Sequence, residues 1–64
     1  MKVLLRNPKR EIEVAGGRSV HRLLDDLELS REAHLVICNG TLVPGDRRLR
    51  DADVIEVRPV ISGG

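Results

Sequence analysis

The chain has 64 residues, of which 41 % are hydrophobic and none is aromatic, and eleven basic residues against ten acidic ones give a formal net charge of +1. This length suits one small domain with a modest core. The near-neutral charge and the lack of rings on which bases could stack argue against a nucleic-acid partner. No apolar run approaches the ~20 residues of a membrane span, so we expect no membrane partner and a cytoplasmic location.

The first half of the sequence predicts a β-hairpin followed by a helix. Aliphatic runs at residues 2–6 and 11–15 flank the turn signal Asn7-Pro8. Ser19 is a favourable helix N-cap, and the apolar residues after it have the spacing of an amphipathic stripe. These are Val20, Leu23, Leu24 and Leu27. The charged residues between them are interpreted as a solvated helix surface.

The second half predicts three more strands. Residues 33–38 are apolar at nearly every position, which suits a strand buried on both faces or one whose second face meets a partner. Alternation does not decide whether Leu35 and Ile37, or Val36 and Cys38, face the helix. Asn39-Gly40 is a strong hairpin signal before a short strand at 41–43. Leu49 is the apolar anchor of a polar connector, and residues 54–59 form the last strand.

The resulting β-β-α-β-β-β order predicts an α+β fold of the β-grasp (ubiquitin-like) type. We expect a four- to five-stranded mixed sheet with one helix packed across one face. Pro59 cannot donate a ladder hydrogen bond, so regular pairing is expected to stop near it. The predicted organisation is a β-grasp domain over residues 1–59 and a flexible tail over residues 60–64 that ends in Gly-Gly.

The cysteine and the histidines do not predict a site. Cys38 is alone, so it cannot form an internal disulfide, and with His21 and His34 it lacks the spacing of a zinc site. We interpret Cys38 as a small buried hydrophobe, with a reactive thiol as the alternative. No metal site, bound cofactor or catalytic constellation is expected, and the chain is not expected to be an enzyme.

The element order, the segments NGTLVPGD (39–46) and DADVIEVRPV (51–60), and the pair Gly63-Gly64 together resemble a known family. They are similar to the ubiquitin-like sulfur carriers of the ThiS and MoaD type, and ThiS most closely. The connector from Asp46 to Asp51 is shorter than in many relatives.

The resemblance implies that the carboxylate of Gly64 is the reactive group. A ThiF-like adenylyltransferase would activate it with ATP, and a sulfur donor such as a cysteine desulfurase would supply the sulfur of a thiocarboxylate. Thiazole synthase would then receive that sulfur for thiamine biosynthesis. Alternatives are a MoaD-like subunit of molybdopterin synthase, a carrier for another sulfur metabolite, a ubiquitin-like modifier, and a β-grasp interaction module.

The tail, residues 60–64, is suited to enter an enclosed active site of the partner enzyme. Gly63 and Gly64 have no Cβ and accept backbone angles that other residues avoid, while Ser62 is small. We expect Val60 and Ile61 to contact the partner, with folding back onto the sheet edge as the alternative.

The docking surface is expected opposite the helix. It would include Leu4, one face of residues 33–38 and the exposed face of the last strand. A rim of arginines is expected to favour an acidic partner: Arg47, Arg48, Arg50 and Arg58.

Overall fold

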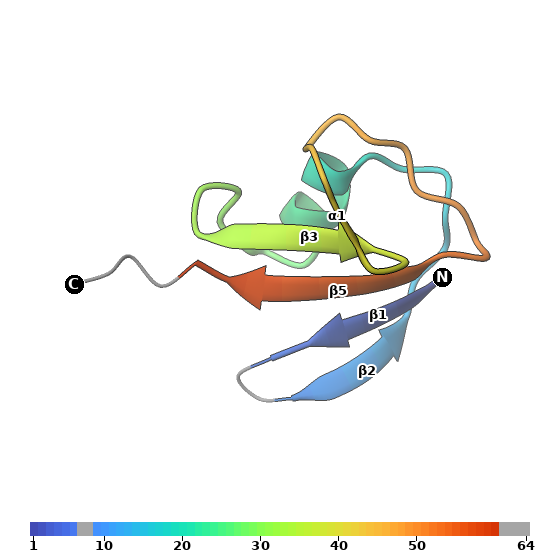
Figure 1. The fold of residues 1–64 in the computed structure, drawn as a ribbon, viewed down its shortest axis with the longest axis horizontal. Coiled ribbons are helices and arrows are strands. Elements are labelled where there is room, and N and C mark those ends of the chain that lie inside the picture. The colour runs from blue at the N-terminus through green and yellow to red at the C-terminus, as the bar shows by residue number, and fades with distance from the viewer. Residues whose placement is uncertain (7–8, 61–64) are drawn as a thin grey trace.

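In a computed structural model, which describes residues 1–6 and 9–60, a helix packs across one face of a five-stranded sheet (Figure 1). The elements are β1 (Lys2–Leu5), β2 (Arg10–Glu13), α1 (Val20–Asp26), β3 (His34–Cys38), β4 (Thr41–Val43) and β5 (Val54–Pro59). The predicted α+β architecture is confirmed, with the larger of the two expected strand numbers.

The last strand of the chain is the central strand of the sheet. The order is β2-β1-β5-β3-β4. β5 runs parallel to β1 and antiparallel to β3, and the outer pairs β1–β2 and β3–β4 are antiparallel. β5 therefore joins the two hairpins into one mixed sheet.

Alternate residues of the three inner strands make the face that packs against α1. They are Val3, Leu5, Val36, Cys38, Ile55 and Val57. In the register of β3 and β5, Val36 lies beside Val57 and Cys38 beside Ile55. The choice left open by the sequence is thus decided: Val36 and Cys38 face the helix, and Leu35 and Ile37 lie on the other face.

Helix α1 begins at the predicted cap and depends on the sheet for its stability. The Oγ of Ser19 accepts a hydrogen bond of 3.2 Å from the Arg22 backbone N–H. Seven residues are too few for a helix that is stable alone. Val20, Leu23 and Leu24 are buried against the sheet, and each fully buried leucine contributes about 1.5–3 kcal/mol.

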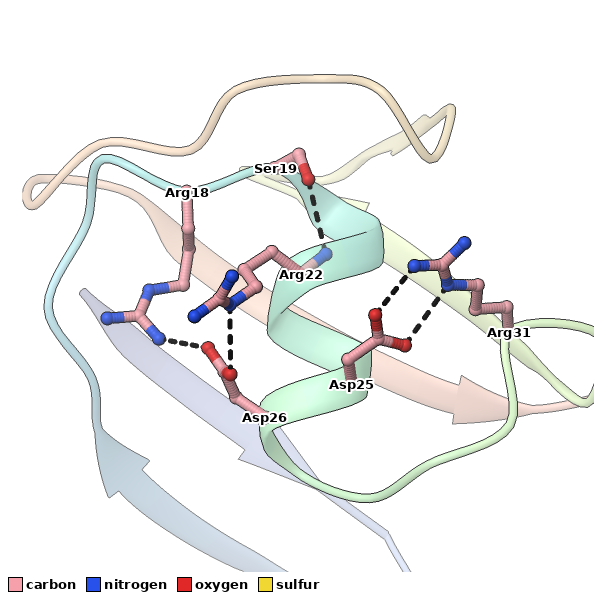
Figure 2. Close-up of polar contacts among 6 residues, drawn as sticks. All are labelled: Arg18, Ser19, Arg22, Asp25, Asp26 and Arg31. Atoms are coloured by element: carbon pink, nitrogen blue, oxygen red, sulfur yellow. Dashed lines mark hydrogen bonds and ion pairs between the residues drawn. The ribbon is translucent and has the colours of Figure 1, made fainter.

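As expected, the outer face of α1 is solvated. It also carries ion pairs (Figure 2). Asp26 accepts hydrogen bonds from Arg18 and from the Nε of Arg22. Asp25 accepts two from Arg31, at 3.1 Å from Nε and 2.6 Å from a terminal nitrogen. The Arg31 hydrogen bond lowers the pKa of Asp25. These contacts connect the segments before and after α1 to its exposed side.

The connector between β4 and β5 is held against the start of α1. Leu49 is fully buried, as expected of its one apolar anchor. The backbone N–H of His21 donates to the Gly45 carbonyl at 2.9 Å, and that of Gly17 donates to the Leu49 carbonyl at 2.8 Å. Within the described part of the chain, no helix has the length and apolar character needed to cross a bilayer.

Candidate functional site

The central strand carries the chain to one end of the sheet. β5 ends at Pro59, and the backbone N–H of Val60 donates to the carbonyl of Ala33 at 2.7 Å. This bond continues the β3–β5 pairing one residue past the strand. The Val60 side chain remains 43 % exposed. The predicted site residues Ile61, Ser62, Gly63 and Gly64 lie outside the described residues.

The sheet face opposite α1 carries an apolar surface, which we call the open face. Its apolar members are Leu4, Leu35, Ile37, Leu42 and Val54. Leu35 is 46 % exposed and Leu42 is 60 % exposed. The second face of β3 therefore does not lie under another element of the described chain.

The strand registers place five residues in one row across the open face. From β4 to β2 the row is Leu42, Ile37, Glu56, Leu4 and Glu11. Leu4, a predicted docking residue, is half-buried in this row. It also lines a hollow together with Arg6, Lys9 and Glu56. The row places the carboxylate of Glu56 between the apolar side chains of Ile37 and Leu4.

Two arginines hold that carboxylate. The Nε of Arg58 donates to Glu56 Oε2 at 2.7 Å, and a terminal nitrogen of Arg6 donates to the same oxygen at 3.2 Å. The Arg58 hydrogen bond is the main reason that the pKa of Glu56 lies below its ordinary value. Arg58 and Glu56 are neighbours on one side of β5, and Arg6 follows β1. The hydrogen bonds among these three side chains therefore connect the C-terminal ends of the parallel strands β1 and β5.

Comparison with known proteins identifies the family. The model of the ThiS family matches residues 3–64. The chain belongs to the ThiS family. It is also similar to the sulfur carrier protein TtuB of Thermus thermophilus, with 37 % identity over an alignment of 65 positions that covers 100 % of both chains. This ThiS-family chain is therefore a sulfur carrier protein and not an enzyme.

The arginines predicted to surround the open face divide into two groups in this ThiS-family chain. Arg58 lies on that face, where it pairs with Leu35 of β3. Arg47 and Arg48 instead lie beside the start of α1, because the Arg47 carbonyl accepts from the Val20 N–H and Arg48 bridges to Ser19. The expectation of one arginine rim is thus wrong for these two residues. Their position follows from the path of the connector across the helix.

The thiol of Cys38 and the imidazole rings of His21 and His34 contact other parts of the fold. Cys38 is 4 % exposed, and burial, with Asp53 nearby, raises the pKa of its thiol. The ring of His21 covers Gly45, and His34 Nδ1 lies 2.9 Å from the Ser30 carbonyl. Among residues 1–6 and 9–60, no group of three His, Cys, Asp or Glu side chains has an arrangement that could hold a metal ion.

Two features of the site were not predicted from the sequence. The bond between Val60 and Ala33 depends on the pairing of β3 with β5. The contacts of Glu56 were also not predicted, although Glu56 and Arg58 are two residues apart in a strand and therefore share a face. That spacing was the available signal for the pair, whereas Arg6 joins it only through the β1–β5 register.

Proposed function

We propose that the carboxylate of Gly64 carries the sulfur as a thiocarboxylate. The observation that carries this proposal is the family match, which runs to residue 64 and includes Gly63-Gly64. The similarity to a named sulfur carrier over 100 % of both chains supports it. In the described residues, Cys38 is the single thiol, and it is buried. The carboxylate of Gly64 is therefore a better candidate than the Cys38 thiol for the group that carries the sulfur.

A carboxylate is a poor electrophile, so the reaction begins with activation. A carboxylate oxygen of Gly64 attacks the α-phosphate of ATP, and pyrophosphate leaves to give an acyl-adenylate. A sulfide equivalent then attacks the acyl carbon, the bond to AMP breaks, and the thiocarboxylate forms. A ThiF-like adenylyltransferase carries out the first step. A cysteine desulfurase or similar enzyme supplies the sulfur as a persulfide, and a thiol reductant brings it to the sulfide level with formation of a disulfide. The carrier itself binds no cofactor, and the ATP requirement suits a cytoplasmic reaction.

The tail residues serve passage into the partner's active site. That site must exclude water, because water would hydrolyse the adenylate. Gly63 and Gly64 have no side chain to obstruct a narrow channel, and Ser62 is small. Pro59 restricts the backbone just before the tail, which lowers the entropy cost of docking.

The adenylyltransferase docks on the open face. Leu35 supplies exposed apolar area beside the half-buried Leu4, and Arg58 supplies a charged group close to the end of β5. Val60 and Ile61 lie between Pro59 and Gly64 in the sequence, and we expect both to contact the enzyme. The bond from Val60 to Ala33 supports the arrangement, because it holds the start of the tail beside β3.

Intact-mass spectrometry tests the thiocarboxylate. Incubation with the activating enzyme, ATP and a sulfur donor is expected to add the mass difference between one sulfur and one oxygen. A chain lacking Gly63 and Gly64 serves as the control and is expected to show no change. An unchanged mass of the full chain, with a known carrier converted under the same conditions, would refute the proposal. Gly64-dependent conjugates to other proteins would instead support the modifier alternative.

The destination of the sulfur is proposed to be the thiazole of thiamine. The ThiS family match supports this assignment. The test supplies the thiocarboxylate form to thiazole synthase and, separately, to the large subunit of molybdopterin synthase. Sulfur transfer is expected with thiazole synthase. Transfer to the molybdopterin enzyme alone would favour the MoaD-like alternative and leave the carrier chemistry intact.

A further inference from the structure

Three arginines on the connector between β4 and β5 form no ion pair in the part of the chain that the structure describes. Among the described residues, five other arginines form ion pairs with carboxylates: Arg6, Arg18, Arg22, Arg31 and Arg58. Of the remaining four arginines, three lie within one short segment. We call Arg47, Arg48 and Arg50 the basic ridge. Their side chains are exposed and line one open hollow together with Gly17 and Asp51.

The backbone beneath the basic ridge is fixed from both sides. Leu49, in the middle of the ridge, is fully buried, and its N–H donates to the Arg18 carbonyl at 2.8 Å. The N–H of Val20 donates to the Arg47 carbonyl at 3.0 Å. The N–H of Arg50 donates to Asp53 Oδ2 at 2.8 Å. A backbone held in this way adds little backbone ordering cost when a partner binds the guanidinium groups.

The basic ridge is remote from the reactive tail. Arg50 and Asp53 form the turn that immediately precedes β5, whereas the tail follows the other end of that strand. A strand of six residues spans roughly 17–20 Å. Figure 1 shows the connector, in orange, crossing α1 and reaching the end of the sheet opposite the end of the β5 arrow. A protein bound to the open face and tail therefore leaves the basic ridge accessible.

We propose that the basic ridge is a second docking surface, for a protein partner that presents a cluster of carboxylates while the tail is held elsewhere. Guanidinium groups pair with carboxylates in a bidentate geometry. The guanidinium groups of the basic ridge form no ion pair among the described residues, so they remain available for such contacts. An acidic protein fits better than a nucleic acid. The chain has no aromatic residue on which unpaired bases could stack.

Binding of a defined acidic probe tests the basic ridge. An oligo-glutamate peptide is titrated into the isotope-labelled full chain, and backbone amide shifts are followed by NMR. The largest changes are expected at residues 16–18 and 45–51. The triple substitution Arg47→Gln, Arg48→Gln and Arg50→Gln is expected to weaken binding about tenfold, since it removes three exposed ion pairs with the peptide. An unchanged melting temperature of the variant excludes misfolding as the cause.

A second triple variant removes the same charge elsewhere. Lys2→Gln, Lys9→Gln and Arg10→Gln are expected to leave peptide affinity within about twofold. Equal losses in the two triple variants would mean that net charge alone attracts the peptide, and the proposal would fail. Tighter binding of an oligo-uridylate RNA of equal length to the ridge would overturn the assignment to a protein partner.

Independence from the tail is tested with the activating enzyme. Saturating oligo-glutamate peptide is expected to leave the rate of Gly64 adenylation unchanged, because the two surfaces lie at opposite ends of β5. Competition between the peptide and the activating enzyme would overturn simultaneous docking. The NMR titration requires no activating enzyme, so its outcome is independent of the proposed sulfur chemistry.

Discussion

Val60 and Ala33 are joined by a backbone hydrogen bond of 2.7 Å at the point where the chain leaves the sheet. Ala33 precedes β3 and Val60 follows β5, so the bond extends the antiparallel pairing beyond the last residue of the strand. The start of the tail is thereby fixed relative to the open face. A partner that binds this face meets the tail at a defined position, which lowers the entropy cost of inserting it.

Substitution of Val60 by proline tests this bond, because proline has no backbone N–H. We expect Val60→Pro to lower the free energy of unfolding by about 1 kcal/mol and to raise the KM for adenylation. Val60→Ala keeps the N–H and is the matched control for lost side-chain contact. Equal KM values for the two variants, both above that of the parent chain, would assign the effect to the side chain.

Leu35 and Leu24 separate partner binding from stability. Leu35 is exposed on the open face, whereas Leu24 of α1 is buried against the sheet. Leu35→Ala is expected to raise the KM for adenylation with little change in melting temperature. Leu24→Ala is expected to lower the free energy of unfolding by about 2–5 kcal/mol and to leave the KM of the folded protein unchanged. Urea unfolding and steady-state kinetics measure the two effects, and an unaltered KM for Leu35→Ala would remove Leu35 from the docking surface.

Gly16 is required by the close approach of the connector. A Cβ at Gly16 would lie 2.4 Å from the Asp51 backbone nitrogen, whereas one at Gly45 would lie 1.9 Å from His21 Nε2, the end of a side chain. Because backbone cannot move aside as a ring can, Gly16→Ala is expected to cost about 1–3 kcal/mol of stability and Gly45→Ala less. Thermal unfolding provides the comparison. Rescue of Gly45→Ala, but not of Gly16→Ala, by His21→Ala would confirm the difference.

Glu56 is expected to titrate below its ordinary pKa. Its hydrogen bond with Arg58 is the largest cause, and Arg6 adds to it. A pKa depressed by folding stabilises the protein above the unfolded-state pKa, and this contribution is lost as the pH falls through the folded-state pKa. NMR titration of the Glu56 side chain is expected to show a larger upward shift in Arg58→Ala than in Arg6→Ala. The reverse order would mean that the contact across strands dominates.

Cys38 is expected to resist labelling in the folded state. Burial raises the pKa of its thiol, and Asp53 adds to the effect. The thiolate fraction at neutral pH is therefore reduced, and the sulfur is also inaccessible to reagents. Labelling with a thiol reagent should be slow in buffer and fast in denaturant. Rapid labelling of the folded chain would revive the reactive-thiol alternative.

The secondary-structure elements and the fold class follow from local patterns in the amino-acid sequence. Ser19 and the apolar stripe after it are enough to start a short amphipathic helix, and Asn39-Gly40 is enough to place a hairpin between β3 and β4. The burial of Leu49 also followed from the sequence, because it is the one apolar anchor in a polar connector. These features depend on local conformational preference and on hydrophobic spacing, which a single chain displays directly.

The contacts between residues distant in sequence depend instead on how the strands pair. The insertion of β5 between β1 and β3 turned Val36 and Cys38 inward, because a strand's register with its neighbour selects the buried face. The same insertion brought Arg6 to Glu56, fifty positions apart in sequence. It also set the end of β5 apart from the basic ridge. Such contacts depend on long-range pairing between strands, and no local pattern in the sequence encodes them.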